Sequence, residues 1–179
     1  MKMTTRQDQR GVALFMSLIM LLIITMMGIS SVQTTSLQQR MSQNAADANL
    51  SFQSAESGLR DAEDHIETFL SLNGFDGGAG DGYYFEGDPT DTPIWRNIDW
   101  LDDGANFRDG EDVPGTARAP KYLIEHVKTV ISDADALNLD NIGQDTGSGR
   151  TQMFRITVHG TGGTVNAHTM LQATYGKRL

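Results

Sequence analysis

The sequence "QRGVALFMSLIMLLIITMMGIS" (residues 9–30) is the stretch that decides the fold of this chain. A short charged leader ends in Gly11 and passes directly into an apolar run, and no charged residue follows before Arg40. About 20 apolar helical residues, at roughly 1.5 Å each, span the roughly 30 Å hydrocarbon core of a bilayer. Because a helix satisfies its own backbone hydrogen bonds there, residues 12–32 are predicted to form a transmembrane helix.

Charge is distributed unevenly on the two sides of this run. The chain carries a net charge of −9, and the leader carries +2 from Lys2, Arg6 and Arg10 against Asp8, so the remainder carries −11. By the positive-inside rule, the leader is expected to stay in the cytoplasm and the acidic body to be exported. An acidic body argues against nucleic-acid binding, which requires basic residues to contact phosphates.

A cleaved secretory signal peptide is the main alternative for the apolar run. Such a signal has an apolar region of about 7–15 residues, followed by a small-residue cleavage site. Here the run is longer, and the residues after Ser30 and Ser31 continue a helical pattern. The sequence therefore favours a retained anchor.

Beyond the anchor, apolar residues recur every three or four positions, which indicates one face of a helix. They are Leu37, Met41, Ala45, Ala48, Phe52, Ala55, Leu59, Ala62, Ile66 and Phe69. The Asn-Gly pair at residues 73–74 is a helix stop signal. One helix is predicted over residues 12–72, with its weakest point at Gly28. Its second half is amphipathic and needs a partner surface, either a sheet or, in a coiled-coil stalk, another helix.

Three strands are predicted in the last third of the chain, at residues 121–131, 153–160 and 167–176. They are expected to form an antiparallel sheet with one buried face, covered by the amphipathic helix. Residues 73–120 hold many Gly and Asp and all four prolines, and are predicted to be loops pinned to the core by aromatic side chains. The predicted fold class is α+β. In the middle strand, Phe154, Ile156 and Val158 are expected on one face and Arg155, Thr157 and His159 on the other.

The sequence offers little that indicates catalysis. It has no cysteine, and none of its four histidines lies in an H-E-x-x-H pattern. His159 and His168 are expected to face each other across the C-terminal hairpin as a solvent-exposed pair. No aspartate-rich stretch fits the spacing of an EF-hand. No catalytic residue, cofactor or metal site is therefore predicted, and the protein is not expected to be an enzyme.

The glycine–apolar junction, the long helix and the sheet together resemble the type IV pilin family. In that family a prepilin peptidase cuts after the leader glycine and methylates the new N-terminus. The resemblance implies cleavage after Gly11 and N-methylation at Val12, and the helix then becomes the core of a filament. Pilins usually have glutamate at the fifth mature position, thought to pair with the N-terminal amine of a neighbouring subunit. Here that position is Met16, which implies a minor pilin that sits at the tip or in the initiating complex.

Three further segments, "SFQSAESGLRDAE", "YLIEHV" and "FRITVHGTGGTVNAHTMLQATYGKRL", resemble the PilX-type minor pilins. The resemblance covers residues 9–72 and about 120–179, and the Gly/Asp-rich middle shows no match. It implies a leader at 1–11, a hydrophobic transmembrane and filament-core helix at 12–35, an amphipathic helix at 36–72, a loop region at 73–120 and an antiparallel sheet at 121–179.

The resemblance implies a structural subunit that primes type IV pilus assembly and supports twitching motility, adhesion or DNA uptake. Its implied partners are other minor pilins, the major pilin, a PilC/PilY-type tip adhesin, the prepilin peptidase and the inner-membrane assembly platform. Before assembly the chain would span the inner membrane once, with a periplasmic body, and afterwards it would lie in the pilus at the cell surface. Two alternatives stay open: a K-like minor pseudopilin of type II secretion, usually larger, and a membrane-anchored periplasmic enzyme or binding module.

Overall fold

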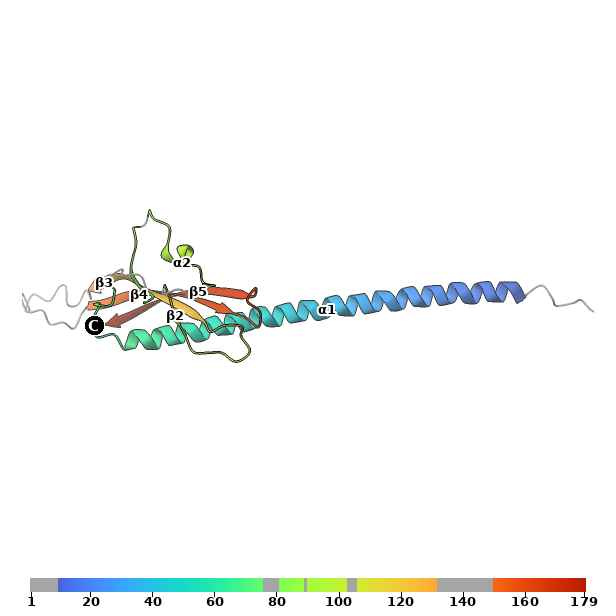
Figure 1. Cartoon of the computed structure of the whole chain (residues 1–179), viewed down its shortest axis with the longest axis horizontal. Helices are drawn as coiled ribbons and strands as arrows, with labels where there is room; N and C mark the ends of the chain where they lie inside the picture. The colour runs from blue at the N-terminus through green and yellow to red at the C-terminus, as the bar shows by residue number, and fades with distance from the viewer. Residues whose placement is uncertain (1–9, 76–80, 89, 103–105, 132–149) are drawn as a thin grey trace, which may run out of the picture. The chain divides into compact units, whose positions relative to one another are not determined.

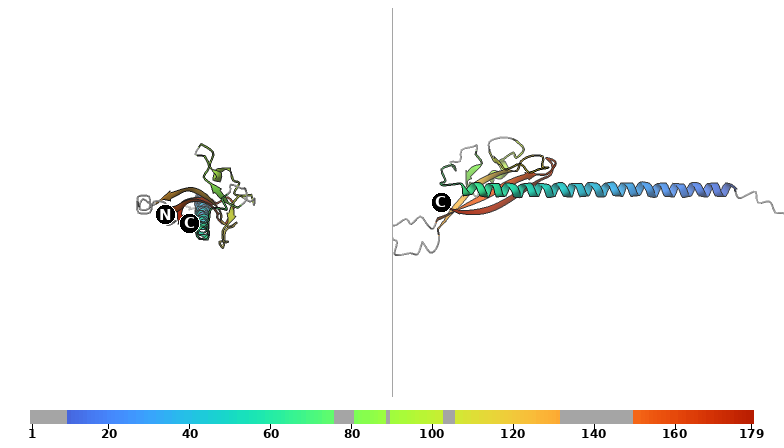
Figure 2. Two further views of the ribbon diagram at one scale, coloured as in Figure 1. Left: turned by 90° about the vertical axis from the view of Figure 1, so that its left-hand side faces the viewer. Right: turned by 90° about the horizontal axis from the view of Figure 1, so that it is seen from below.

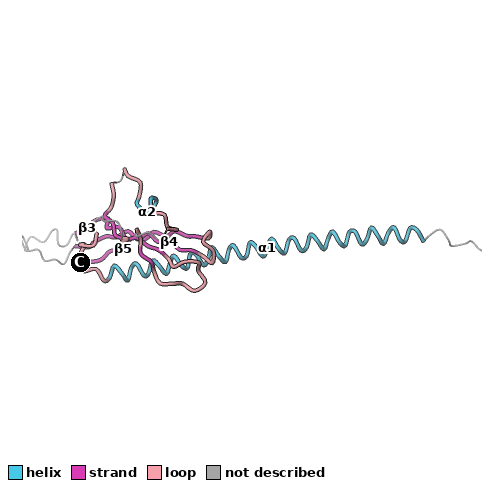
Figure 3. Tube along the Cα trace, in the orientation of Figure 1, coloured by secondary structure: helices cyan, strands magenta, loops and turns pink. Residues whose placement is uncertain are grey.

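A computed structural model describes residues 10–75, 81–88, 90–102, 106–131 and 150–179 (Figure 1). Residues 1–9 of the predicted leader lie outside this description. The chain divides into two compact units, residues 1–45 and 46–179, and the boundary falls within the long helix. The first unit consists of helix in its described part, whereas the second contains helix, strands and loops (Figure 3).

Helix α1 spans Arg10–Glu67 and is helical through Gly28, the point where a kink was expected. It ends at Glu67 rather than near residue 72. The Nζ atom of Lys177 donates hydrogen bonds to the carbonyl oxygens of Ile66, at 2.9 Å, of Glu67, and of Phe69, at 2.9 Å. The last carbonyls of a helix have no partner within it, so this lysine, which comes from the far end of the chain, stabilises the helix terminus.

The three predicted strands form, and they build the main part of a five-stranded sheet. Strands β3 (Lys121–Ile131), β4 (Arg150–Thr161) and β5 (His168–Arg178) are antiparallel neighbours. Two short strands, β1 (Tyr83–Phe85) and β2 (Arg108–Asp109), pair with β3. Because β1 runs parallel to β3, the sheet is mixed rather than wholly antiparallel as expected. The loop region also contains the one-turn helix α2 (Ile94–Asn97).

One face of the sheet packs on the last turns of α1, as predicted, and curves over one side of that helix (Figure 2). From the helix, Ala55, Ala62 and Ile66 are fully buried, against Phe154, Ile156, Val158, Tyr122 and Ile124 of the sheet and Phe75 of the following loop. The apolar stripe of α1 has different surroundings on the two sides of Ala55. Its members after Ala55 contact the sheet, whereas Phe52 is 41% exposed. The buried helix positions just before and beside Ala55 are instead small residues, Ser51, Ser54 and Gly58.

Small residues are required here because the backbones of α1 and β4 approach each other closely. A Cβ atom on Gly160 of β4 would lie 2.4 Å from the amide nitrogen of Ala55 and 2.5 Å from the carbonyl oxygen of Ser51. A Cβ on Gly162 would lie 2.4 Å from Oδ1 of Asp47. These distances are shorter than any non-bonded carbon contact, so only glycine fits. The glycines of the segment "HGTGG" are therefore contact points between strand and helix as well as turn residues.

The second face of the sheet is also covered, which corrects the expectation of one buried face. Trp100, Phe107 and Leu123 form a buried cluster there, with Tyr84, Trp95 and Ile98 packed at its edge. Thr157 and His159, expected to face solvent, are only 1% and 6% exposed. The aromatic residues of the loop region thus pin it to the sheet as predicted. Phe85 is 46% exposed, yet its ring still contacts those of Phe75 and His126.

Replacement of Gly160 by Ala is expected to lower the free energy of unfolding by at least about 3 kcal/mol, because the new methyl group has no space between strand and helix. The measurement is urea unfolding of the full chain in detergent micelles, followed by tryptophan fluorescence. Gly87→Ala is the matched control, since a Cβ at Gly87 meets nothing within 4 Å. Equal stability of the two variants would contradict the close approach.

Candidate functional site

The apolar part of α1 is the first candidate site, because its side chains have no partner within the described chain. Every large apolar residue from Val12 to Val32 is between 38% and 71% exposed. The helix is long and apolar enough to cross a membrane, by length and composition. So large an apolar surface is unstable in water and requires a bilayer or other apolar helices around it.

The hydroxyl groups within this segment do not interfere with such surroundings. Ser17 donates to the carbonyl oxygen of Leu14 at 2.8 Å, and Thr25 donates to those of Leu21 and Leu22, both at 2.8 Å. The hydroxyl of Ser31 likewise bonds a carbonyl of the preceding turn. A hydroxyl that is satisfied by its own helix can enter hydrocarbon without an unpaired polar group.

Gly11, the predicted cleavage position, lies in the first turns of α1. A Cβ atom built on Gly11 meets nothing within 4 Å, and its backbone is not in the left-handed region. The fold therefore does not require glycine at this position, in contrast to Gly160. Val12 and Met16, the other two predicted site residues, follow on the same helix and are 60% and 61% exposed. No carboxylate occurs in residues 12–39.

In the second unit, Asp47 of α1 holds the turn between β4 and β5. Its carboxylate accepts hydrogen bonds from the backbone amides of Gly163 and Thr164 and, at 2.6 Å, from the hydroxyl of Thr164. The hydroxyl bond of Thr164 is the main cause that lowers the pKa of Asp47. This carboxylate therefore stays ionised and fixes the glycine-rich turn on the helix.

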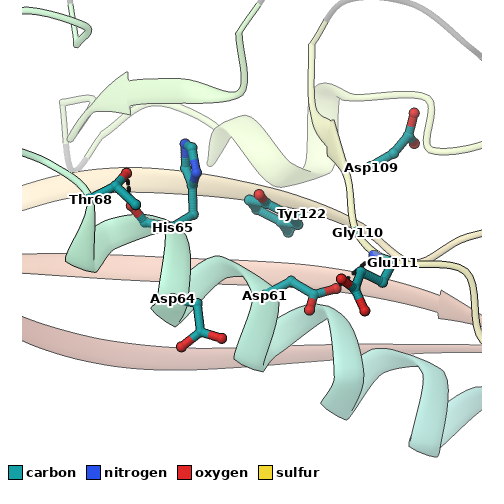
Figure 4. A pocket seen from close by; sticks show the side chains of 8 residues that line it. All are labelled: Asp61, Asp64, His65, Thr68, Asp109, Gly110, Glu111 and Tyr122. Atoms are coloured by element: carbon teal, nitrogen blue, oxygen red, sulfur yellow. Dashed lines mark hydrogen bonds between the residues drawn. The ribbon is translucent and has the colours of Figure 1, made fainter.

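An acidic hollow of about 450 Å³ lies between α1 and β2, lined by Asp61, Asp64, His65, Asp109 and Glu111 among others (Figure 4). Its carboxylates do not converge. Asp61 accepts a hydrogen bond from the backbone amide of Glu111 at 2.7 Å, while Asp64 and Asp109 point in different directions (Figure 4). Within the described residues, no three histidine, aspartate or glutamate side chains are placed to hold a metal ion.

The histidine pair lies across the hairpin as expected, but only His168 is exposed to solvent, and His159 is buried. His159 is buried between the rings of Trp100 and His168, with both centroid distances 5.5 Å and interplanar angles of 14° and 22°. Phe107 stacks on the other side of Trp100. Burial, together with the nearby positive charges of His168 and Lys121, lowers the pKa of His159 to about 4. No local sequence pattern predicts this stack, because Trp100 reaches it from the loop region.

Two family models match the chain over nearly its whole length. The model "PilX N-terminal" matches residues 10–60, and the model "Type IV pilus assembly protein PilX C-term" matches residues 72–177. The chain belongs to the PilX family of type IV pilus assembly proteins. No curated protein and no solved structure is significantly similar to it.

Membership of the PilX family makes this chain a minor pilin of type IV pilus assembly. The family matches also correct one expectation. The Gly/Asp-rich middle was expected to lie outside the resemblance, yet the C-terminal model includes it. Its position on the second face of the sheet gives the physical reason: these loops are part of the folded body, since they carry Trp100 and Phe107 of the second core cluster.

Replacement of His159 by Phe is expected to reduce the loss of stability in acid. The pKa of His159 is about 4 in the folded chain and about 6.5 when unfolded, so the unfolded chain binds the proton more tightly. The stabilising effect of the neutral ring is complete above pH 6.5 and is lost as the pH falls toward 4. From about pH 7 to about pH 4, the natural chain should lose about 3 kcal/mol more of its unfolding free energy than the variant.

The measurement is urea unfolding in detergent micelles at each pH, with fluorescence from Trp95 and Trp100 as the signal. Phe keeps a flat ring in the stack but does not titrate, so it serves as the control for packing. The same loss of stability in both proteins would contradict the assignment to His159.

Proposed function

We propose that this minor pilin is cleaved after Gly11, N-methylated at Val12, and enters the type IV pilus at or near its tip, where it primes assembly. The observation that carries the proposal is an exposed helix whose apolar run begins directly after Gly11 and which lacks any carboxylate over residues 12–39. Residues 12–35 would form the filament core, residues 36–67 would continue the helix into the body, and the segments that follow it would complete that body.

The absence of structural strain or crowding at Gly11 supports a role in processing. Nothing in the fold demands glycine there, since a side chain would meet open space. Because the fold does not require this glycine, we assign it to recognition by the prepilin peptidase. Cleavage on the cytoplasmic side of the apolar run would keep the helix attached to the body, as a filament subunit requires.

Once the helix has left the bilayer, burial against neighbouring subunits would keep its apolar surface out of water and hold the filament together. Apolar surface removed from water contributes about 25 cal/mol per Å², so a helix with this many exposed apolar side chains gains a large free energy on packing. Leu37, Met41 and Phe52, at 61%, 71% and 41% exposure, extend this surface beyond the anchor. They form the part of the apolar stripe that the sheet does not cover.

Met16 supports a terminal position in the filament. A free N-terminal amine buried in an apolar bundle is costly unless a carboxylate neutralises it. With methionine at the fifth mature position, this subunit cannot neutralise the amine of a neighbour. Such a subunit fits a place where that contact is not needed, namely the tip or the initiating complex.

The proposed partners are other minor pilins, the major pilin, a PilC/PilY-type tip adhesin, the prepilin peptidase and the inner-membrane assembly platform. Before assembly the helix would anchor the chain in the inner membrane with the body in the periplasm, and afterwards the chain would lie in the surface pilus. Support of twitching motility, adhesion or DNA uptake follows from that location, without catalysis.

Replacement of Gly11 by Val is expected to stop processing while the helix persists, because the new side chain meets no atom of the fold. The measurement is the intact mass and N-terminal sequence of the chain from cells with an active prepilin peptidase. The natural chain should start at methylated Val12, and the variant at Met1. Gly28→Val, at another uncrowded helical glycine, is the control and should be processed normally. A natural chain that starts at Met1, or beyond Ser31, would contradict the proposal.

Replacement of Met16 by Glu is expected to spread the subunit along the filament, because the new carboxylate can pair with a neighbouring amine. The measurement is immunogold labelling of pili in a deletion strain that expresses the variant in place of the natural copy. The deletion strain without any copy should show fewer surface pili, while the major pilin accumulates in the membrane. Met20→Glu, one helical turn later, is the control and should not spread. Labelling that stays at the tip in the Met16 variant, or normal piliation of the deletion strain, would oppose this view.

A further inference from the structure

A pocket of about 260 Å³ on the second face of the sheet combines buried charge with an apolar wall. It lies between the loop after β1 and the paired strands β3 and β4, and it is separate from the acidic hollow of Figure 4. Four carboxylates and one guanidinium line it together with an aliphatic residue: Glu86, Asp88, Asp91, Glu125, Arg155 and Ile94. With all groups ionised, the net charge of the lining is −3.

Glu125 is the unusual residue of this pocket. Its side chain is only 3% exposed, and its Oε2 atom has no hydrogen-bond partner. The nearest cation is Arg155, its direct partner across β3 and β4, whose Nη1 atom lies 3.6 Å from that oxygen. Arg155 gives its short contact, 2.9 Å, to Glu86 instead. The guanidinium of Arg155 is therefore shared between the carboxylates of Glu86 and Glu125, and Oε2 of Glu125 remains without a donor. A buried oxygen without a donor lowers the stability of the fold unless a further group donates a hydrogen bond to it.

The missing group is a hydrogen-bond donor, and the net negative charge of the lining favours a cationic one. The structure also favours an organic cation over a metal ion. No three carboxylates or histidines among the described residues are placed to bind one metal. The guanidinium of Arg155 also lies within the pocket, where it would repel a divalent ion more strongly than a singly charged group. The volume is far greater than that of a single ion, and Ile94 and Pro93 provide an apolar wall. An aliphatic chain that ends in an ammonium matches both the wall and the acidic floor.

We propose that this pocket receives a lysine side chain from a partner protein. The methylene groups of the lysine would pack on Ile94, and its ammonium would donate to Oε2 of Glu125. Burial, the main cause, raises the pKa of Glu125, and the charge of Glu86 adds to this. A bound ammonium would oppose both effects and hold the carboxylate ionised. The inference goes beyond pilus assembly and does not depend on the position of the subunit in the filament.

The test is titration of the full chain, in detergent micelles and with labelled isoleucine methyl groups, with the peptide acetyl-Gly-Lys-Gly-amide. The methyl resonance of Ile94 should shift with a Kd in the millimolar range, typical of one small charged contact. The peptide acetyl-Gly-norleucine-Gly-amide, which keeps the stem but lacks the charge, should bind at least about tenfold more weakly. The Glu125→Gln and Glu86→Gln variants should weaken binding of the lysine peptide, whereas Glu56→Gln, at an exposed helix position, should not.

Four results would overturn the proposal. Equal binding of the two peptides would mean that the pocket recognises only apolar stems. Unchanged affinity in the Glu125→Gln variant would remove the buried carboxylate from recognition. A shift of Ile94 with calcium chloride but not with the lysine peptide would make this a metal site, and no shift with any probe up to about 20 mM would mean that the pocket takes none of them.

Discussion

The close approach between the backbones of α1 and β4 is the constraint on which the folded body depends. At Gly160 the strand lies so near the helix that even a methyl group does not fit between them. This contact fixes the height of the helix above the sheet, and the small residues Ser51, Ser54 and Gly58 make it possible. The larger side chains Ile66 and Phe154 then fill the wider space near the end of the helix. The two elements thus diverge from a tight contact to an aromatic and aliphatic core.

Two polar contacts stabilise the packing of α1 against the hairpin of β4 and β5, one at each end. At one end the carboxylate of Asp47 receives the amides of the turn between β4 and β5. At the other, Lys177 of β5 donates to three carbonyls at the end of α1. Both contacts join residues more than 100 positions apart in the chain, since Asp47 and Thr164 are separated by 117 residues and Lys177 and Ile66 by 111. Helix and hairpin therefore hold each other in register at both ends.

The second face of the sheet carries a different kind of chemistry. Close to the hairpin, Trp100 stacks on the buried ring of His159, which stays neutral over the physiological pH range because its pKa is about 4. Farther along β3, the loop leaves Glu125 buried with an incomplete set of donors. The stack around His159 stabilises the body, whereas the buried carboxylate of Glu125 lowers its stability and forms part of a pocket. A costly buried charge of this kind is typical of a site that is completed by a ligand.

The apolar helix and its relation to the leader follow from the sequence alone. Length, lack of charge and the position of Gly11 predict an anchor, and the three long strands are recognisable because local alternation reports which residues face inward. The same local patterns also account for the amphipathic character of the later half of α1. These patterns do not reveal how much of the apolar stripe of α1 packs on the sheet, since Ala55 and Phe52 both belong to the stripe and only Ala55 is buried.

The identity of the contacts was decided by the tertiary structure. The parallel pairing of β1 with β3, the cover of the second face, the cap from Lys177 and the unpartnered oxygen of Glu125 each join residues distant in the chain. Periodicity describes one element at a time and shows only that a face needs a partner. Which partner it receives depends on how the strands and loops close around the glycine contact, and that is a property of the whole fold. The sequence by itself determined the membrane-compatible helix and the three long strands, and only their packing determined the stack around His159 and the pocket of Glu125.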